Sequence, residues 1–378
     1  MLTIDRYLLR QFLWLFCIFV CSFTGLYIIA DSVNNFEELS SFAEENGGLL
    51  RVILVYYGAR SLAFFDQVSA ILVLITALFT IAAFRRHNEM TALMAAGIRK
   101  ARIVRPVIMV GIAFCLFATI NREFIIPSMI DKLSYNAQDL SADHQRKVTP
   151  RYDNETRVFI MAEGAILREK RLVRPTFHMP IGPLQRYGTQ FSAATASHLP
   201  ADGQRPTGFL LDGVAEADDL RGKPSLTIGD KPVVITPRDA AWLEHDQCFV
   251  ATGVDIERLT GGTHWRQYAS VFQLIGGLRN ASNDYGSDVR VEIHSRIVRP
   301  LLDVTLLFLG IPLVLTRESR NMLLAVGNCV VLVALFLVVV MATEYLGSHL
   351  SLSPALAAWC PLMIFVPISA MTAQPLLE

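Results

Sequence analysis

The chain has 378 residues, of which 52% are hydrophobic and 18% charged, and its mean hydropathy is +0.40. This composition is too apolar for an ordinary soluble domain of this length and indicates an integral membrane protein. Lysine plus arginine and aspartate plus glutamate both number 34, so the net charge is zero and the chain as a whole shows no affinity for nucleic acid.

Long apolar runs predict six membrane-spanning helices. A helix that crosses the hydrocarbon core of a bilayer needs roughly 17 to 25 mostly apolar residues. Four runs are clearly long enough, whereas the third and fourth are shorter and carry no charge except Asp303. In chain order, the predicted spans are residues 12–30, 67–84, 106–120, 300–316, 322–343 and 352–374.

The loop of residues 85–105, between the second and third predicted spans, sets the expected orientation. Lysine and arginine accumulate on the cytoplasmic side of membrane helices, so a strongly basic loop is expected to be cytoplasmic. Counting spans outward then places both termini in the cytoplasm and the region after the third span outside it. The basic residues of this loop are Arg85, Arg86, Arg99, Lys100, Arg102 and Arg105.

Residues 49–65 form an apolar helical stretch ahead of the second span, and this stretch contains Arg60. We expect it to lie at, or enter from, the outer interface, with Arg60 extending toward the headgroups. The span count places Arg122, Arg296 and Arg299 near the same level. These four cations are candidates to bind lipid phosphates, although an ordinary interfacial anchoring role explains each one singly.

The pattern changes after the third span to short alternating runs separated by glycine, proline, aspartate and asparagine. It predicts an all-β domain over residues 122–291, either a sandwich, a jelly roll or an open barrel. Residues 1–121 with three spans precede this domain, and residues 292–378 with three spans follow it. Helices are expected near its ends, at 128–145 and 270–279. The predicted strands are residues 157–162, 164–168, 190–195, 208–212, 232–236 and 248–251.

Asp303 is the one acid inside a predicted span. An intramembrane carboxylate is a candidate for a functional role because its burial is unfavourable. Arg299 lies one helical turn earlier and is spaced to pair with it. We favour a structural ion pair over a role in proton or substrate transfer.

The sequence contains none of the common motifs of an enzyme. The nucleotide-binding pattern G-x-x-x-x-G-K-[ST] is absent, as are H-E-x-x-H, C-x-x-C and G-x-S-x-G. The eight histidines are scattered along the chain. We therefore expect no catalytic site, no metal and no cofactor, and no ATP site of the chain's own.

The loop between the second and third spans contains a short predicted helix. Met90, Leu93, Met94 and Gly97 follow the spacing i, i+3, i+4 and i+7, which gives one apolar and adaptable face. Glu89 stands in the first turn, where the helix dipole favours an acid. A helix on the membrane surface and a helix that docks a partner both fit this pattern.

Residues 86–98, Arg-His-Asn-Glu-Met-Thr-Ala-Leu-Met-Ala-Ala-Gly-Ile, resemble the characteristic loop of the lipopolysaccharide-export permeases, the membrane subunits of the Lpt ABC transporter. The resemblance continues from end to end of the chain. Met94 departs from it, because the family usually has an arginine there, and this leaves the details of partner contact open. The further similar stretches are residues 5–12, 121–127, 292–300 and 309–313.

The resemblance implies a six-span permease of the inner membrane with a periplasmic β-jelly-roll domain between the third and fourth spans. Two such subunits, paralogues or copies, would enclose a cavity that extracts lipopolysaccharide and passes it to periplasmic jelly-roll proteins. A separate cytoplasmic ABC ATPase dimer would supply the energy.

The resemblance also suggests roles for residues of this chain. Contact with the ATPase is expected at the short helix, through Glu89, Met90, Leu93, Gly97 and Ile98. This makes docking the favoured role of that helix. The first span would border the lipid cavity as a lateral gate, and Phe23 and Tyr27 are candidates to line it.

Two other functions remain open on sequence grounds. A permease of the same build could move another lipid or a lipoprotein, because the acyl chains of different lipids require the same apolar lining. The chain could also be a membrane-anchored assembly or sensor protein that transports nothing. Association with an ATPase would distinguish a transporter from a sensor.

Overall fold

The computed structural model describes the chain as two compact units. The helical unit comprises Met1–Asn34, Leu54–Met129 and Gly286–Glu378, and the β unit comprises Asn35–Ile53 and Ile130–Tyr285. The described residues are 3–45, 48–134, 145–167, 169–179, 190–203, 205–215, 222–228, 231–260, 263–282, 286–316, 322–349 and 352–377.

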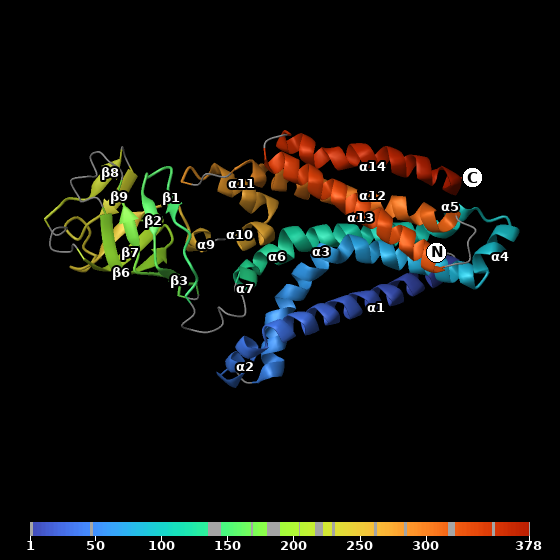
Figure 1. Cartoon of the computed structure of the whole chain (residues 1–378), viewed down its shortest axis with the longest axis horizontal. Coiled ribbons are helices and arrows are strands. Elements are labelled where there is room, and N and C mark those ends of the chain that lie inside the picture. Colours follow the sequence, from blue (N-terminus) through green and yellow to red (C-terminus); the bar gives the residue numbers. More distant parts are fainter. Residues whose placement is uncertain are drawn as a thin grey trace. The chain divides into compact units, whose positions relative to one another are not determined.

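Long helices build the helical unit (Figure 1). Five predicted spans each fall within one of them, and the sixth, 352–374, begins two residues before its helix. Five candidate spans are long and apolar enough to cross a membrane: Thr3–Asn34, Leu49–Arg86, Lys100–Ser128, Gly327–Ser348 and Pro354–Ala373. The helix that contains the fourth predicted span is not among these five, so a sixth crossing stays a prediction. The helices are α1 Thr3–Asn34, α3 Leu49–Arg86, α5 Lys100–Ile120, α12 Ser287–Thr316, α13 Met322–Ser348 and α14 Pro354–Leu377.

Several helices extend beyond the apolar runs that predict them. Residues 49–65 are the first part of α3, a continuous helix of 38 residues, and not a separate element. After α5 the chain continues through a π-helical turn, η1 Asn121–Ile125, into α6 Ile126–Ser128. Charged residues end an apolar run without ending a helix, because arginine and glutamate are good helix formers.

Small residues let the long helices approach one another closely. A Cβ on Gly111 of α5 would lie 2.7 Å from a methyl of Leu307 in α12 and 3.3 Å from one of Val73 in α3. Gly310 of α12 packs in the same way against Leu74 of α3. Such contacts are typical of helices packed in a membrane, where dispersion forces replace the hydrophobic effect.

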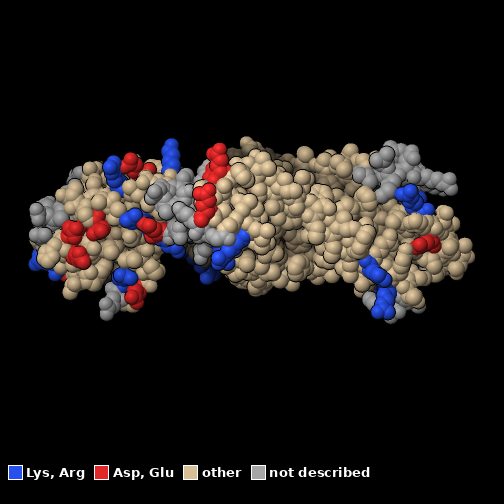
Figure 2. Space-filling model, turned by 90° about the horizontal axis from the view of Figure 1, so that it is seen from below, with Lys and Arg blue, Asp and Glu red and all other residues tan. Residues whose placement is uncertain are grey.

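The two ends of the helical unit differ in composition. Both chain termini lie at the end that carries the short helix α4 Glu89–Ala95 (Figure 1). Figure 2 shows lysine and arginine side chains, with an acidic one between them, at that end, whereas the middle of the unit presents uncharged side chains on the face drawn. Helices α5 and α6 run from α4 to the opposite end, from which the chain leaves for the β unit.

The β unit contains an antiparallel sheet of ten strands in the order β1-β2-β5-β6-β7-β10-β9-β8, with β3 and β4 paired beside β6. Its core includes Phe177, Phe191 and Phe209, which are fully buried. The strands are β1 Arg151–Tyr152, β2 Phe159–Met161, β3 Gly164–Ile166, β4 Arg171–Val173, β5 Thr176–His178, β6 Gln190–Leu199, β7 Gly208–Val214, β8 Leu226–Ile228, β9 Lys231–Ile235 and β10 Cys248–Ala251.

Side-chain contacts tie strands from different parts of this sheet together. Buried Asp153, after β1, accepts a hydrogen bond of 2.6 Å from the hydroxyl of Thr252, after β10. Glu155 forms an ion pair with Lys231 of β9. The sheet therefore curls so that its early and late strands meet. It is a separate antiparallel β domain, as predicted, and its jelly-roll connectivity stays a prediction.

All six predicted strands coincide with observed ones, and the helix predicted at 270–279 is α11 Val271–Arg279. This helix begins with a capping box between Ser270 and Gln273. Of the helix predicted at 128–145, the structure shows α7 Ile130–Ser134, and residues 135–144 lie outside the described residues. The remaining short helices are α2 Phe36–Glu45, α9 Ile256–Leu259 and α10 Thr263–Tyr268.

Candidate functional site

The predicted docking helix is present as α4, which links α3 to α5. Its N-cap, Asn88, has a φ of 58°. Asparagine tolerates this left-handed conformation better than most residues, so the chain can turn sharply after the long helix α3. At the other end, Gly97 has a φ of +80°, where a glycine avoids strain.

The apolar residues of α4 do not form one free face, and this corrects the sequence interpretation. Met90 is buried in the core of the helical unit, and Leu93 and Ile98 pack against that core. Met94 and Gly97 are exposed. A helix of seven residues between two long helices must cover their ends, so it turns its larger residues inward. Its exposed residues are Thr91, Ala92, Met94 and Ala95, followed by Ala96 and Gly97.

Polar contacts join this region to the first turns of α1. The Tyr7 hydroxyl donates a hydrogen bond of 3.4 Å to Glu89 of α4. Arg102 of α5 donates two hydrogen bonds to the carboxylate of Asp5, at 3.1 and 3.0 Å. Paired hydrogen bonds of this kind fix geometry as well as adding energy. Thus α4 and α5 are both attached to the start of α1.

A buried ion pair lies farther along the helical unit. The guanidinium of Arg122 in η1 contacts the carboxylate of Asp66 in α3 at 2.9 and 2.8 Å. Their side chains are 6% and 11% exposed. Asn121 beside Arg122 donates a hydrogen bond of 3.0 Å to the Leu62 carbonyl of α3. Asp303 is therefore not the only acid inside the helical unit.

The sequence interpretation missed Asp66 because the apolar run was drawn from the residue that follows it. Joining residues 49–65 and the second span into one helix would have placed Asp66 inside that helix, as the structure does. Charges inside such a helix are expected to face protein neighbours.

Arg299 and Asp303 attract each other electrostatically within a larger group of charges, and a direct ion pair between them stays a prediction. Arg299 also interacts with Asp66 and Glu344 and is repelled by Arg122. The group joins charges from α3, η1, α12 and α13. Beside it, buried Arg296 donates a hydrogen bond of 2.8 Å to Glu292 on the preceding turn of α12.

Of the other predicted lipid-binding residues, Tyr27 and Arg60 contact aromatic side chains. The ring of Tyr27 in α1 stacks on Phe64 of α3 with 4.5 Å between centroids. Arg60 lies over the ring of Tyr56, 4.2 Å from its centroid, which is a cation–π geometry. Phe23 is 39% exposed on α1. These side chains lie on α1 and on the first half of α3.

Comparison with models of protein families identifies a family that matches most of this chain. The model of the family described as "Lipopolysaccharide export system permease LptF/LptG" matches residues 6–151 and 130–374. The two overlapping matches together take in nearly the whole chain, including α4 and the β unit. A search of curated proteins finds no match.

Proposed function

Because the chain belongs to the LptF/LptG family of lipopolysaccharide export permeases, we propose that it extracts lipopolysaccharide from the inner membrane and is driven through α4 by a separate ABC ATPase. The observation that carries this proposal is the attachment of α4 and α5 to α1. A displacement of α4 would be transmitted to α1 through the hydrogen bond of Tyr7 to Glu89. An accompanying displacement of α5 would be transmitted through the ion pair of Asp5 with Arg102. Cycles of ATP hydrolysis can thereby move a helix that borders the lipid.

The composition of the helical unit supports the orientation that this requires. Its basic end carries α4 and both termini (Figures 1 and 2). Since lysine and arginine accumulate in cytoplasmic loops, we assign this end to the cytoplasm. The β unit follows from the opposite end and is assigned to the periplasm. There it would pass lipid to jelly-roll proteins that lead toward the outer membrane.

Lipid extraction needs a continuous apolar surface, because each acyl CH₂ exposed to water costs about 0.8 kcal/mol. Helix α1 offers such a surface. It is the least buried of the five candidate spans, because only 11% of its most apolar segment is buried within the protein. Its exposed residues include Phe23, Leu26, Ile29 and Val33. Paired with a second permease, a paralogue or a copy, this face would line the cavity.

Two of the arginines are buried and position the helices around them. Arg122 and Arg296 are already engaged by Asp66 and Glu292, so we assign them first to holding α3, η1 and α12 together. Arg60 and Arg299 remain candidates to bind lipid phosphates, together with the aromatic residues Phe23 and Tyr27.

Substitution of Glu89 tests whether α4 couples the permease to an ATPase. We expect Glu89→Arg to lower both ATPase copurification and lipopolysaccharide release from vesicles. Tyr7→Phe is the matched control, because it removes the hydroxyl that bonds Glu89 and keeps the ring. If Glu89 meets the ATPase directly, Tyr7→Phe retains ATPase binding and loses only coupled release.

A second variant probes the exposed face of α4. Ala92→Arg leaves the buried contact of Met90 in place and adds a bulky charge where the partner is expected. We expect it to abolish ATPase copurification. Normal copurification and normal lipid release in both Glu89→Arg and Ala92→Arg would contradict the proposed function of α4.

A further inference from the structure

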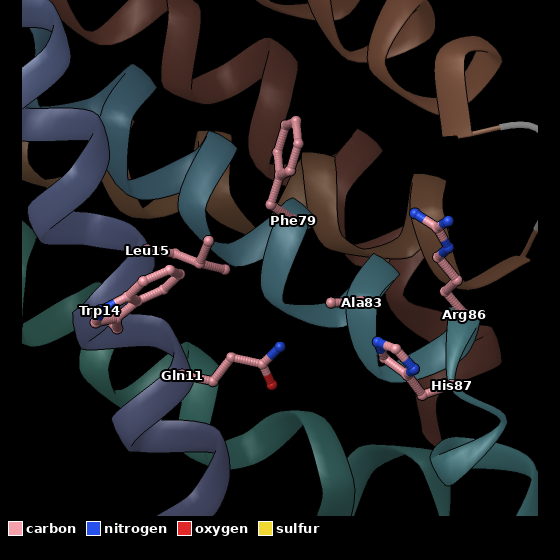
Figure 3. Close-up of a pocket in the computed structure, with 7 residues that line it drawn as sticks. All are labelled: Gln11, Trp14, Leu15, Phe79, Ala83, Arg86 and His87. Atoms are coloured by element: carbon pink, nitrogen blue, oxygen red, sulfur yellow. The ribbon is translucent and has the colours of Figure 1, made fainter.

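A pocket opens between α1 and the end of α3 (Figure 3). Its volume is about 180 Å³. Helix α1 contributes Gln11, Trp14 and Leu15 to its lining. The last turns of α3 contribute Phe79, Ala83 and Arg86, and His87 follows.

The pocket is apolar at one end and cationic at the other. Trp14, Leu15 and Phe79 form the apolar part. The ring of Phe79 also meets that of Phe19 edge-on, with 5.3 Å between the ring centroids. Arg86 and His87 form the other end, one to two helical turns farther along the chain (Figure 3). A ligand that fits both ends must be an amphiphile.

A polar atom of the lining is unsatisfied. The buried Gln11 Oε1 has no hydrogen-bond partner among the described residues. A buried acceptor left unpaired is destabilising. Because the two ends of an amide are assigned by their neighbours, Gln11 can present either its oxygen or its NH₂ to a ligand. The side chain points from α1 toward Ala83 and His87 (Figure 3).

The charge around the pocket favours an anion. The acids nearest to its lining in sequence are Asp5 and Glu89, and these are engaged by Arg102 and Tyr7. Arg10, one turn before Trp14 on α1, is exposed and adds a positive charge to this end of the helix. Arginine and tryptophan at one level of a membrane helix are typical of the headgroup region.

We propose that this pocket binds an anionic glycerophospholipid from the leaflet that meets the α4 end of the helical unit. The phosphate contacts Arg86 and His87, Gln11 bonds the ester region, and one acyl chain lies against Trp14 and Phe79. A free phosphate would leave the apolar part unused. The site lies at the α4 end of the helical unit, whereas the chain leaves for the β unit from the other end, so the lipid proposed here is distinct from the one that the proposed function exports.

Photocrosslinking tests this proposal and does not depend on the export function. The full-length protein is reconstituted in phosphatidylcholine vesicles with a small fraction of phosphatidylglycerol that carries a photoreactive acyl chain. We expect crosslinks on α1 near Trp14 and on α3 near Phe79. Unlabelled phosphatidylglycerol is expected to compete, and phosphatidylcholine is not.

Three variants locate the binding. Arg86→Gln is expected to lower the crosslinking about tenfold, because it removes a hydrogen bond to a charged group. Ala83→Trp fills the groove and should abolish the crosslinks on both helices. Arg99→Gln is the matched control, since Arg99 is exposed in the same basic loop and does not line the pocket. It is expected to bind lipid like the unmodified protein.

Other results would overturn the proposal. Equal losses in Arg86→Gln and Arg99→Gln would assign the effect to general surface charge. Equal competition by phosphatidylcholine would show that no anionic headgroup is recognised. Crosslinks from Trp14 to another protein chain, in place of lipid, would identify a protein as the occupant. Since Arg86 is exposed, its substitution leaves the fold intact and keeps the test valid.

Discussion

Asp66 and Arg122 each depend on the other, because neither charge is stable alone where their side chains are buried. The pair joins α3 to η1 with contacts of 2.9 and 2.8 Å. The desolvation of two buried charges roughly offsets their attraction, whereas one charge left alone is strongly destabilising. The pair therefore acts mainly to fix which turn of α3 meets η1.

Removing one member of this pair should destabilise the protein more than removing both. We expect Arg122→Gln to lower the free energy of unfolding by about 3–5 kcal/mol. The double variant Asp66→Leu with Arg122→Met should recover most of that loss. Thermal unfolding in detergent measures both effects. A double variant no more stable than Arg122→Gln would show that the pair itself is needed.

His198 makes the stability of the β unit depend on pH. Burial lowers the pKa of His198, Asp255 at 3.5 Å opposes this shift, and Lys170 adds to it. Because the folded state binds the proton less readily than the unfolded state, stability is complete above the ordinary histidine pKa of about 6.5 and falls as the pH drops below it.

Exposure of Cys248 measures this effect, because Cys248 is buried in β10 of the same sheet. In a chain whose other cysteines are replaced, we measure the urea concentration at which half of Cys248 has reacted. This concentration should be lower at about pH 5.5 than at about pH 7.5. We expect His198→Gln to show a smaller fall. An equal fall in both proteins would assign the pH dependence to other groups.

At the residue scale, the sequence singled out Arg122, Arg296 and Arg299 but did not reveal the partners of Arg122. Arg122 was expected at an interface, and its partner Asp66 lies 56 positions earlier on another helix. Arg299 and Asp303 were found together because both stand on one helix, a turn apart. Spacing along a helix reveals pairs within that helix, and pairs between helices depend on how the helices pack.

At the scale of elements, the close contacts of glycines decide how the long helices pack. A Cβ on Gly310 would meet the side chain of Leu74 in α3. The same atom on Gly327 of α13 would meet nothing within 4 Å. Two glycines in apolar helices therefore differ in what surrounds them.

This difference predicts opposite outcomes for one substitution. Gly310→Leu should separate α12 from α3 and destabilise the helical unit by about 1–3 kcal/mol, as overpacking does. Gly327→Leu should be tolerated. The midpoint of thermal unfolding compares them directly, and equal destabilisation of both variants would contradict the packing described.

The elements themselves were predictable where a long pattern marks them. Each of the six predicted spans coincides with a helix because each is an apolar run, but the helix ends were missed, mostly because helices continue past charged residues. Strands β1, β4, β5 and β8 were not predicted, since a strand of two or three residues gives only a weak pattern, and β2 and β3 were found only because longer apolar runs surround them. The buried face of α4 was also missed, because its burial is set by the ends of α3 and α5.

At the scale of the whole molecule, the two ends of the helical unit differ in their chemistry. The basic end of the helical unit holds α4, the start of α1 and the pocket lined by Arg86. The other end leads into an antiparallel β domain. A lipid exporter needs such a division, because ATP is hydrolysed on one side of the membrane and the lipid leaves on the other.

Cysteine labelling of the two ends tests this central claim most directly. Asp202→Cys places a thiol in the exposed turn between β6 and β7, and Ala92→Cys places one on the exposed face of α4. With the native cysteines replaced, a membrane-impermeant maleimide should label Asp202→Cys in intact spheroplasts and Ala92→Cys only after lysis. Labelling of Ala92→Cys before lysis, with Asp202→Cys protected, would contradict the orientation and the function built on it.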